Sequence, residues 1–425
     1  MKRDSLAGWL AYLETLHPKS IAMGLARVRA VHDRLGLRID VPVVVVGGTN
    51  GKGSTCAFLE AMLRAGGHRV GLYTSPHLRR YNERVRIAGA EADDTALMAA
   101  FETVERARTA SMPATPLTYF EFGTLAALML FAQARLDVLV LEVGLGGRLD
   151  AVNLIDATVA VVTAVDLDHM DYLGATREAI GAEKAGIMRA GHPAVCGDRD
   201  PPASLIEHAR AIGASLYRLG REFDYVDERT QWRYRGPCGE RFGLPVPALR
   251  GRYQLANAAT ALTVLDLIRE QVPIDAGAVR AGLAGVELAG RFQVLPGRPT
   301  IVLDVAHNPQ AAGALAATLG EMGYHPQTRA VVGMLSDKDI DGVVAHLAPR
   351  VDRWYVATLP GPRGASAQVL ADHLRARGVA QDAVAAFPDV PAALAAARDA
   401  SDDTDRIVVF GSFLTVAAAL AALAR

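Results

Sequence analysis

The strongest constraint on the fold is a β-branched run that ends in a glycine-rich turn. Residues 41–48 read VPVVVVGG, and residues 49–55 continue as TNGKGST into a helical pattern that runs from Ser54 to about Ala65. A short, continuously apolar run is typical of a parallel strand buried on both faces. Further strands are expected at 68–75, 136–144 and 156–166, and further helices at 120–134 and 177–189. This alternation predicts an α/β fold with a mostly parallel sheet.

The chain of 425 residues is long enough for more than one domain. Residues 223–247 mix polar and aromatic positions with Gly and Pro, which predicts a small antiparallel excursion before a helix at 252–268. A Gly/Pro-punctuated stretch follows, and a second alternation of strands and Ala-rich helices then begins. We therefore expect an N-terminal domain over 1–288, a hinge at 289–298 and a smaller Rossmann-like domain over 299–425.

Composition narrows the classes of protein. The chain has 45 Lys+Arg against 46 Asp+Glu and a net charge of −1, which argues against general binding of nucleic acid. Its cysteines are too few and too scattered for a disulfide framework. We expect no signal peptide and no membrane span, because the N-terminus has no apolar core segment and no run reaches about 18 apolar residues. A cytoplasmic location is the resulting prediction.

The turn at 47–55 has the composition of a phosphate-binding loop. Glycines let backbone N–H groups approach phosphate oxygens, the following helix N-terminus favours anions, and Lys52 adds a positive charge. The pattern departs from the standard eight-residue loop, since Val46 stands in place of the first glycine and Gly53 separates Lys52 from Ser54. An ordinary strand-to-helix turn is the alternative, but strand, lysine and Ser-Thr together favour a nucleotide.

Three further polar positions follow or lie near apolar strands. Glu142 ends the strand pattern at 136–144, where it could hold Mg²⁺ on a nucleotide or simply face water. His169 stands in an acidic loop, and such a histidine is more often solvated than a metal ligand. Lys184 lies in a helical pattern, and its spacing alone favours a surface lysine that extends to water. In the second domain, residues 304–309, 334–339 and 410–413 place polar groups at strand ends, where ligands bind α/β sheets.

Taken together, the motifs resemble those of the dihydrofolate synthase/folylpolyglutamate synthases, a family of the Mur ligase superfamily. The resemblance is co-linear from residue 9 nearly to the C-terminus. The motifs that carry it are GTNGKGST, TSPHLRRYNERVRI (74–87), LTYFEFGTLAAL (117–128), LEVGLGGRLDAVN (141–153), LDHMDYLG (167–174), EKAGI (183–187), NAATAL (257–262), GRFQ (290–293), DVAHNP (304–309), LSDKD (335–339) and FGSF (410–413).

The resemblance implies a P-loop ATPase domain of Mur-ligase type joined to a Rossmann-like domain, with the substrates meeting in the cleft between them. ATP would phosphorylate a substrate carboxylate, and the amino group of L-glutamate would attack the acyl phosphate to form an amide. Two Mg²⁺ ions are implied, and a monovalent cation is left open. The implied ATP contacts are Asn50, Gly51, Lys52, Gly53, Ser54, Asn257, Arg291 and Asp304, and the implied metal positions are Ser75, Glu142, His169 and Lys184.

The same resemblance implies that Lys184 carries a carbamate, that Lys52, Lys184 and His307 are catalytic, and that Arg84, His307 and Ser412 hold glutamate. The residues implied at the pteroate site are Ala22, Met23, Gly24, Thr118, Tyr119, Phe120, Glu121, Leu149, Asp150 and Ala151.

Substrate range is the remaining question. The motifs at 75–78, 117–122 and 146–151 resemble those of bifunctional members, which add glutamate to 7,8-dihydropteroate and to reduced folates. Bifunctional relatives can carry Asp-Leu-Gly where this chain has Ala22-Met23-Gly24, so a folylpolyglutamate-only enzyme is the alternative. Two less favoured alternatives are another Mur-type amide ligase and a nucleotide-binding regulatory protein that catalyses no reaction. The expected partners are small molecules only, and the expected state is a monomer.

Overall fold

The buried run that opens the sequence pattern forms β1 (Val43–Gly47), a central strand of an eight-stranded sheet. It lies parallel to β5 (Val138–Glu142) on one side and β6 (Val159–Val162) on the other. The sheet order is β4-β3-β2-β5-β1-β6-β7-β8, and only the β2–β3 and β3–β4 pairs are antiparallel. The remaining strands are β2 (Val70–Tyr73), β3 (Val85–Ile87), β4 (Ala90–Glu91), β7 (Pro193–Cys196) and β8 (Ser215–Arg218). The predicted α/β fold with a mostly parallel sheet is confirmed.

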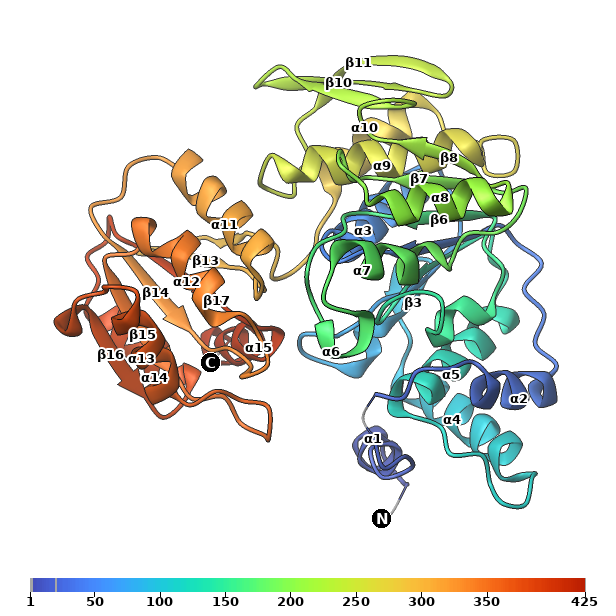
Figure 1. Cartoon of the computed structure of the whole chain (residues 1–425), viewed down its shortest axis with the longest axis horizontal. Coiled ribbons are helices and arrows are strands. Elements are labelled where there is room, and N and C mark those ends of the chain that lie inside the picture. Colours follow the sequence, from blue (N-terminus) through green and yellow to red (C-terminus); the bar gives the residue numbers. More distant parts are fainter. Residues whose placement is uncertain (1–2, 20, 425) are drawn as a thin grey trace. The chain divides into compact units, whose positions relative to one another are not determined.

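Helices surround this sheet (Figure 1). The helices expected at 54–65, 120–134 and 252–268 lie within about two residues of those bounds, whereas the helix expected at 177–189 ends at Ala185. The helix after β1, α3, begins at Lys52 rather than Ser54, because Gly51 has φ of +90° and ends the loop there. The helices are α1 (Leu6–Leu13), α2 (Ala26–Leu35), α3 (Lys52–Ala65), α4 (Asp94–Thr109), α5 (Tyr119–Gln133), α6 (Met170–Leu173), α7 (Arg177–Ala185), α8 (Ala203–Ile212), α9 (Tyr253–Leu267) and α10 (Ala276–Gly285), with short 3₁₀ helices η1 (Tyr81–Arg84) and η2 (Ala151–Leu154).

The expected antiparallel excursion is a three-stranded sheet of order β11-β10-β9. Its strands are β9 (Asp224–Asp227), β10 (Gln231–Gly236) and β11 (Gly239–Pro245). The alternation of burial along β10, where Trp232 and Tyr234 are buried and their neighbours exposed, shows that one face of this sheet is covered.

The second alternation forms a six-stranded sheet of order β12-β13-β17-β14-β15-β16, in which β12 alone is antiparallel to its neighbour. The strands are β12 (Gln293–Leu295), β13 (Thr300–Leu303), β14 (Thr328–Val332), β15 (Arg353–Ala357), β16 (Val384–Phe387) and β17 (Arg406–Phe410). Between them lie α11 (Pro309–Glu321), α12 (Ile340–Leu347), η3 (Ala348–Arg350), α13 (Ala367–Ala376), η4 (Gln381–Ala383) and α14 (Val390–Asp399), and α15 (Phe413–Leu423) follows β17.

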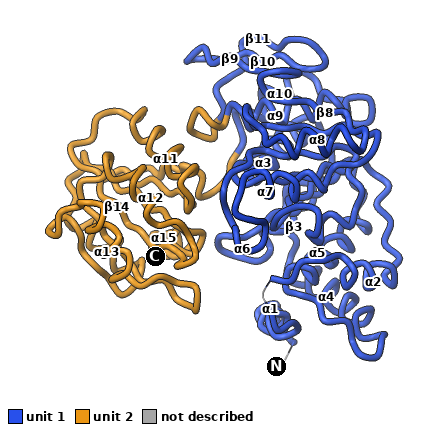
Figure 2. The backbone as a smooth tube through the Cα atoms, viewed as in Figure 1, with its two compact units in different colours: residues 1–247, 255–286 blue, residues 248–254, 287–425 orange. Residues whose placement is uncertain are grey.

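This computed structural model describes residues 3–19 and 21–424. The chain divides into two compact units (Figure 2): unit 1 comprises Met1–Pro247 and Leu255–Val286, and unit 2 comprises Ala248–Gln254 and Glu287–Arg425. The segment expected as a hinge, 289–298, thus lies in unit 2 and contains β12. Within the described residues, no helix combines the length and the apolar character needed to cross a membrane.

Candidate active site

The loop expected to bind phosphate, residues 48–51 and called the phosphate loop below, is held by the segment that follows β6. The hydroxyl of Thr49 donates to the carbonyl of Asp166 at 3.0 Å and accepts the N–H of the same residue at 3.1 Å. Thr163 Oγ1 donates to the carbonyl of Asn50 at 2.6 Å. Because β1 and β6 are adjacent parallel strands, these contacts fix the loop at the carboxyl edge of the sheet, where ligands bind α/β folds.

Two glycines of this loop leave no space for a side chain. Gly48 has φ of +143°, and a Cβ there would lie 1.9 Å from Thr163 Oγ1. Gly51 has φ of +90°, and a Cβ there would lie 2.5 Å from Oδ1 of Asn257, a residue of α9. The two glycines therefore let the backbone take a path that any other residue would block. Asn257, expected at the ATP site, indeed lies beside the loop.

Lys52 folds back over the loop that precedes it. Its Nζ donates to the carbonyls of Gly48 at 3.1 Å and Thr49 at 3.2 Å. The loop leads directly into the 14-residue helix α3, whose N-terminus carries the positive end of the helix dipole. A phosphate bound here would meet backbone N–H groups, the dipole and the lysine charge together.

Lys184 is buried, which corrects the surface-lysine interpretation that its spacing favoured. It lies in the last turn of α7 and is only 3% exposed. Burial lowers the pKa of its amine to about 7; the charge of Lys52 acts in the same direction, and Asp168 and Asp150 act in the opposite one. Near neutral pH a large share of this amine is therefore unprotonated, the form that reacts with CO₂.

The loop after β5 fixes the end of α7 that carries Lys184. A Cβ at Gly147 would lie 2.8 Å from the carbonyl oxygen of Glu183 and 3.0 Å from that of Lys184. Arg148 donates its N–H to the Glu183 carbonyl at 2.8 Å and pairs with the Glu183 carboxylate at 2.7 Å. The glycine-rich motif thus positions the lysine through backbone packing.

Two of the expected metal positions, Ser75 and Glu142, lie together at the same sheet edge. The Ser75 N–H donates to Oε2 of Glu142 at 3.0 Å, because β2 and β5 are parallel neighbours that end together. His169 begins α6 in a left-handed conformation with φ of +52°, and its N–H donates to Oδ1 of Asp168 at 2.9 Å.

A carboxylate and a hydroxyl are oxygen donors that suit a hard divalent cation, whereas an imidazole suits a softer one. The described residues contain no group of three or more His, Cys, Asp or Glu that could hold a metal by themselves. The fit therefore depends on the serine hydroxyl, on a lysine carbamate and on the phosphates of a nucleotide.

Arg27, which no sequence pattern singled out, joins two of the segments expected to border pteroate. One of its terminal nitrogens donates to the carbonyl of Ala22 at 2.7 Å and to Oε1 of Glu121 at 2.9 Å. Glu121 Oε2 accepts the Thr118 N–H at 2.8 Å, and Thr118 Oγ1 accepts the Glu121 N–H at 3.2 Å. This reciprocal pair is a capping box that begins α5. The Thr-x-x-Glu spacing could have predicted the cap, whereas nothing local pairs Arg27 with a residue 94 positions away.

The third expected pteroate segment, 149–151, adjoins the first. The Gly24 N–H donates to the Leu149 carbonyl at 3.3 Å. Asp150 accepts the N–H groups of Leu145 and Val152, each at 2.9 Å, so both of its oxygens hold backbone. Burial raises the pKa of this carboxyl to about 6, although the backbone donors act against that shift. Asp150 therefore shapes the loop, and Ala151 follows it as the buried first residue of η2.

Phe120 and Met23 cover the glycines of the loop after β5. A Cβ at Gly144 would lie 2.6 Å from the Phe120 ring, and a Cβ at Gly146 would lie 3.5 Å from Cε of Met23. The structure thus brings all three expected pteroate segments together around one glycine-rich loop.

Arg84 lies against two tyrosine rings. Its Cζ is 5.3 Å from the ring centroid of Tyr81 and 5.5 Å from that of Tyr119, and its Nε donates to Nδ1 of His77 at 2.8 Å. Burial lowers the pKa of His77 to about 4, and the charge of Arg84 adds to this shift. Burial also raises the pKa of Tyr119 to about 12. Only Arg84 and Tyr119 of this group were expected at the site.

In unit 2, Asp304 holds the backbone around β13. Its two oxygens accept the N–H groups of Phe292 and Ala306, each at 2.8 Å. Burial raises the pKa of this carboxyl, and the positive charge of Arg291 acts against that shift. Arg291 itself lies with its Cζ 5.1 Å from the ring centroid of Phe413.

His307 has a defined tautomer. Its Nδ1 lies 2.8 Å from the carbonyl oxygen of Val305, and a carbonyl can only accept, so Nδ1 carries the proton. In the neutral ring, Nε2 is then the nitrogen that can accept a proton.

Ser412 begins α15 and is nearly fully buried. Its Oγ accepts the Thr415 N–H at 3.0 Å and lies 2.8 Å from Thr415 Oγ1, which donates to the Gly333 carbonyl at 2.6 Å. Because the Thr415 proton goes to that carbonyl, the Ser412 proton goes to Thr415. Ser412 can therefore only accept a hydrogen bond from a ligand.

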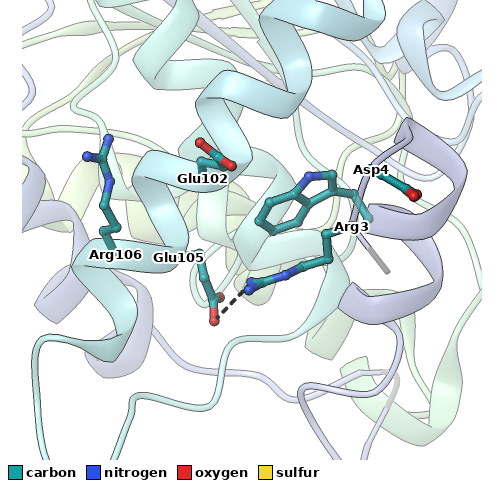
Figure 3. Close-up of a pocket in the computed structure, with 6 residues that line it drawn as sticks. Arg3, Asp4, Glu102, Glu105 and Arg106 are labelled. Atoms are coloured by element: carbon teal, nitrogen blue, oxygen red, sulfur yellow. Dashed lines mark ion pairs between the residues drawn. The ribbon is translucent and has the colours of Figure 1, made fainter. Parts of the chain in front are cut away.

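One open depression lies apart from the predicted residues. It adjoins α1 and α4, and the pair formed by Arg3 and Glu105, 3.7 Å apart, crosses it (Figure 3). Its lining consists of Arg3, Asp4, Trp9, Glu102, Glu105 and Arg106, none of which was expected at the site.

Comparison with known proteins places these features in one family. The family model described as Mur ligase middle domain matches residues 46–265, and the model described as Mur ligase, glutamate ligase domain matches residues 290–413. The dihydrofolate synthase/folylpolyglutamate synthase of Escherichia coli K12 is 47% identical to this chain over 97% of this chain and 94% of its own length.

Solved structures agree with this placement. E. coli FolC in complex with DHPP and ADP superimposes with a TM-score of 0.93 and 45% identity, covering 100% of this chain and 99% of that one. A bifunctional folylpolyglutamate synthase/dihydrofolate synthase with Mn, AMPPNP and L-glutamate bound has a TM-score of 0.91 and 48% identity, with 100% of both chains covered. From its phosphate loop to its C-terminal helix, this chain belongs to the dihydrofolate synthase/folylpolyglutamate synthase family of Mur-type, ATP-dependent ligases.

Proposed function

We propose that this chain joins L-glutamate to 7,8-dihydropteroate, giving dihydrofolate, and extends reduced folates with further glutamates. The observation that carries the proposal is the grouping in unit 1 of a phosphate loop, the Ser75–Glu142 pair and a buried lysine, in a chain that matches bifunctional relatives end to end. The relatives' structures hold ADP, an ATP analogue, a divalent metal, DHPP or L-glutamate.

The proposed chemistry has two steps. A carboxylate oxygen of the pteroate or folate attacks the γ-phosphorus of ATP, giving an acyl phosphate and ADP. The amine of glutamate then attacks the acyl carbon, forming the amide and releasing phosphate. Such phosphoryl transfer needs positioning and neutralisation of charge more than covalent help from the protein. In this proposal Lys52 and Ser54 hold phosphates together with Asn50, Gly51 and Gly53, and Asn257, Arg291 and Asp304 contact the nucleotide.

The metal would be held by Ser75, Glu142, His169 and a carbamate on Lys184. When bound, two Mg²⁺ ions would neutralise the charge of the phosphates. The proposal for Lys184 rests on its burial, on its lowered pKa and on the loop that fixes α7. Lys184→Ala should lose activity, and short carboxylic acids should partly restore it by replacing the carbamate. Full activity of the variant would contradict the carbamate.

The residues proposed for the second step are those that the family resemblance implies. Arg84 and Ser412 would hold the incoming glutamate, with Ser412 accepting from its amine, and Nε2 of His307 would take the amine proton. Residues 22–24, 118–121 and 149–151 would border the pteroate. In this assignment Asp150 acts mainly through the backbone N–H groups that it accepts, and Glu121 acts mainly through Arg27.

One assay tests the function and its main alternative. Incubation with dihydropteroate, L-glutamate and Mg-ATP should give dihydrofolate, ADP and phosphate in equal amounts. Turnover with a reduced folate but not with dihydropteroate would establish the folylpolyglutamate-only alternative, which the Ala22-Met23-Gly24 segment leaves open. No glutamate-dependent hydrolysis of ATP with any pteroate or folate would favour a regulatory protein. Sedimentation of the same preparation tests the proposed monomer.

A further inference from the structure

The segment 74–87 contains side-chain contacts to which the proposed function assigns no role. Only Ser75 and Arg84 have assigned roles, yet His77 and Tyr81 enclose the Arg84 side chain. His77 and Tyr81 meet edge to face at 5.9 Å between ring centroids, and Tyr81 meets Tyr119 in the same way, also at 5.9 Å. The guanidinium lies against both tyrosines and donates from Nε to His77 Nδ1 at 2.8 Å.

The charge of Arg84 is left without an acidic partner. Glu83, its neighbour in sequence, accepts the N–H groups of Leu78, Arg79 and Arg80 at 2.7, 2.7 and 2.8 Å, and so closes the turn before η1. Across the ranges 3–19 and 21–424, no carboxylate forms an ion pair with Arg84. A guanidinium held against aromatic rings in this way keeps its charge for another anion.

The hydrogen bond to His77 determines how that charge is presented. A guanidinium always donates, so Nδ1 of His77 accepts and the proton of the neutral ring lies on Nε2. The bond uses the Nε–H edge of the fork, and the rings of Tyr81 and Tyr119 limit rotation of its plane. The terminal nitrogens are then presented in one orientation, as bidentate binding of a carboxylate requires.

We propose that His77 is a positioning residue that fixes the guanidinium of Arg84 for a carboxylate of the incoming amino acid. The inference rests on the proposed function and on the place of Arg84 at the glutamate site. It assigns to His77 an effect on glutamate affinity that passes through Arg84 and leaves ATP affinity unchanged.

Three substitutions separate this role from a general structural one. The side-chain oxygen of Asn can take the place of Nδ1, that of Gln reaches the place of Nε2, and Ala provides no acceptor. His77→Ala and His77→Gln should raise the KM for L-glutamate about tenfold, the scale of one hydrogen bond to a charged group, while His77→Asn stays near the wild type. The KM for ATP and the melting temperature should stay unchanged in all three.

The wild-type assay comes first, because failure of the wild type to use glutamate would refute the proposed function itself. With an active wild type, an unchanged KM for glutamate in His77→Ala would overturn the positioning role, and so would equal effects of Asn and Ala. An equal rise in the KM for ATP would also overturn it. His373→Ala, which removes a histidine bonded to Asp341 in unit 2, is the matched control and should change neither KM.

If His77→Ala proves unstable, a double-mutant cycle still decides. In an Arg84→Ala background, the His77→Asn and His77→Gln variants should have the same KM for glutamate, because the residue through which they act is gone. A persistent difference between them would contradict the proposal.

Discussion

A methyl group at Gly51 would lie 2.5 Å from Oδ1 of Asn257, so a glycine of the phosphate loop and an asparagine of α9 are in contact with no space between them. This contact makes the loop depend on a helix that begins about two hundred residues later. A substitution of Gly51 would therefore have two effects, the strain of a positive φ and a steric clash, and a second glycine can be used to separate them.

Gly51→Ala should abolish ATP binding, because it adds a clash at the loop to the strain of a φ of +90°. Gly67→Ala is the matched control, since Gly67 has φ of +85° but nothing within 4 Å of an added Cβ. The control should lose about 1–3 kcal/mol of stability and keep its affinity for ATP. Isothermal titration with an ATP analogue measures the difference, and equal affinities in the two variants would contradict the role of the loop.

Lys52→Ala should lower turnover by at least about 10²-fold, because removing one donor that stabilises transition-state charge costs about 10²–10³-fold in acyl transfer and a charged group at a phosphoryl-transfer site is worth about 10³–10⁵-fold. The ammonium group that is removed lies over the carbonyls of Gly48 and Thr49. Lys19→Ala removes an exposed lysine and should leave turnover unchanged. Steady-state release of ADP is the measurement, and near-normal turnover in Lys52→Ala would refute the assignment of the loop.

Lys184 should make the stability of the unmodified protein depend on pH. Its folded pKa of about 7 lies below the ordinary 10.5, so between these values the unfolded chain binds a proton that the folded chain does not. Stability should therefore rise with pH across that window, by up to about 1.4 kcal/mol per pH unit, and the contribution should be flat below it. Buried cysteines and tyrosines with raised pKa values, such as Cys56 and Tyr73, also titrate in this window, so the difference between variants is the measurement. Urea unfolding in CO₂-free buffer should show a steeper rise of stability with pH in the wild type and in Lys19→Met than in Lys184→Met. Equal slopes in the three proteins would exclude the buried lysine as a source.

Thr415→Val should destabilise the C-terminal unit by about 1–3 kcal/mol, since it removes the acceptor of the Ser412 hydroxyl proton and the side-chain donor to the Gly333 carbonyl. Thr415→Ser keeps the hydroxyl and should retain most of the stability. Thermal unfolding compares the two variants. A Val variant as stable as the Ser variant would show that the hydroxyl chain contributes little.

Arg27→Ala should raise the KM for dihydropteroate without changing the KM for ATP, because it removes the hydrogen bonds that connect Ala22 to Glu121. Losing a hydrogen-bonded charge of this kind costs about 1.5–3 kcal/mol, or roughly tenfold or more in KM. Arg29→Ala, on the exposed face of the same helix, is the control. If both variants, or neither, change the KM for dihydropteroate, Arg27 does not organise the pteroate segments.

Local patterns in the sequence predicted a large part of this structure. The apolar run before Gly47, the helix expected from Ser54 and the strand that ends at Glu142 were all visible as short-range periodicity and turn chemistry, although the helix begins at Lys52. These features depend on neighbours within a few positions, so the chain specifies them without its fold. The order of motifs then identified the family, because many local matches in one sequence are more specific than any single match.

Only the tertiary structure decided what several of these residues do. Lys184 has the spacing of a surface lysine and is buried. Asp150 and Asp304, expected at the pteroate and ATP sites, also accept backbone N–H groups, which no local pattern indicated. The contacts of Arg27 with Glu121 and of Gly51 with Asn257 join residues far apart in the chain. The sequence by itself determined the elements, their order and the family. Which side chains are buried and which distant residues pair depends on the way the sheet brings strand ends together at one edge. A local pattern of residues cannot predict this, because the partners are far apart in the sequence.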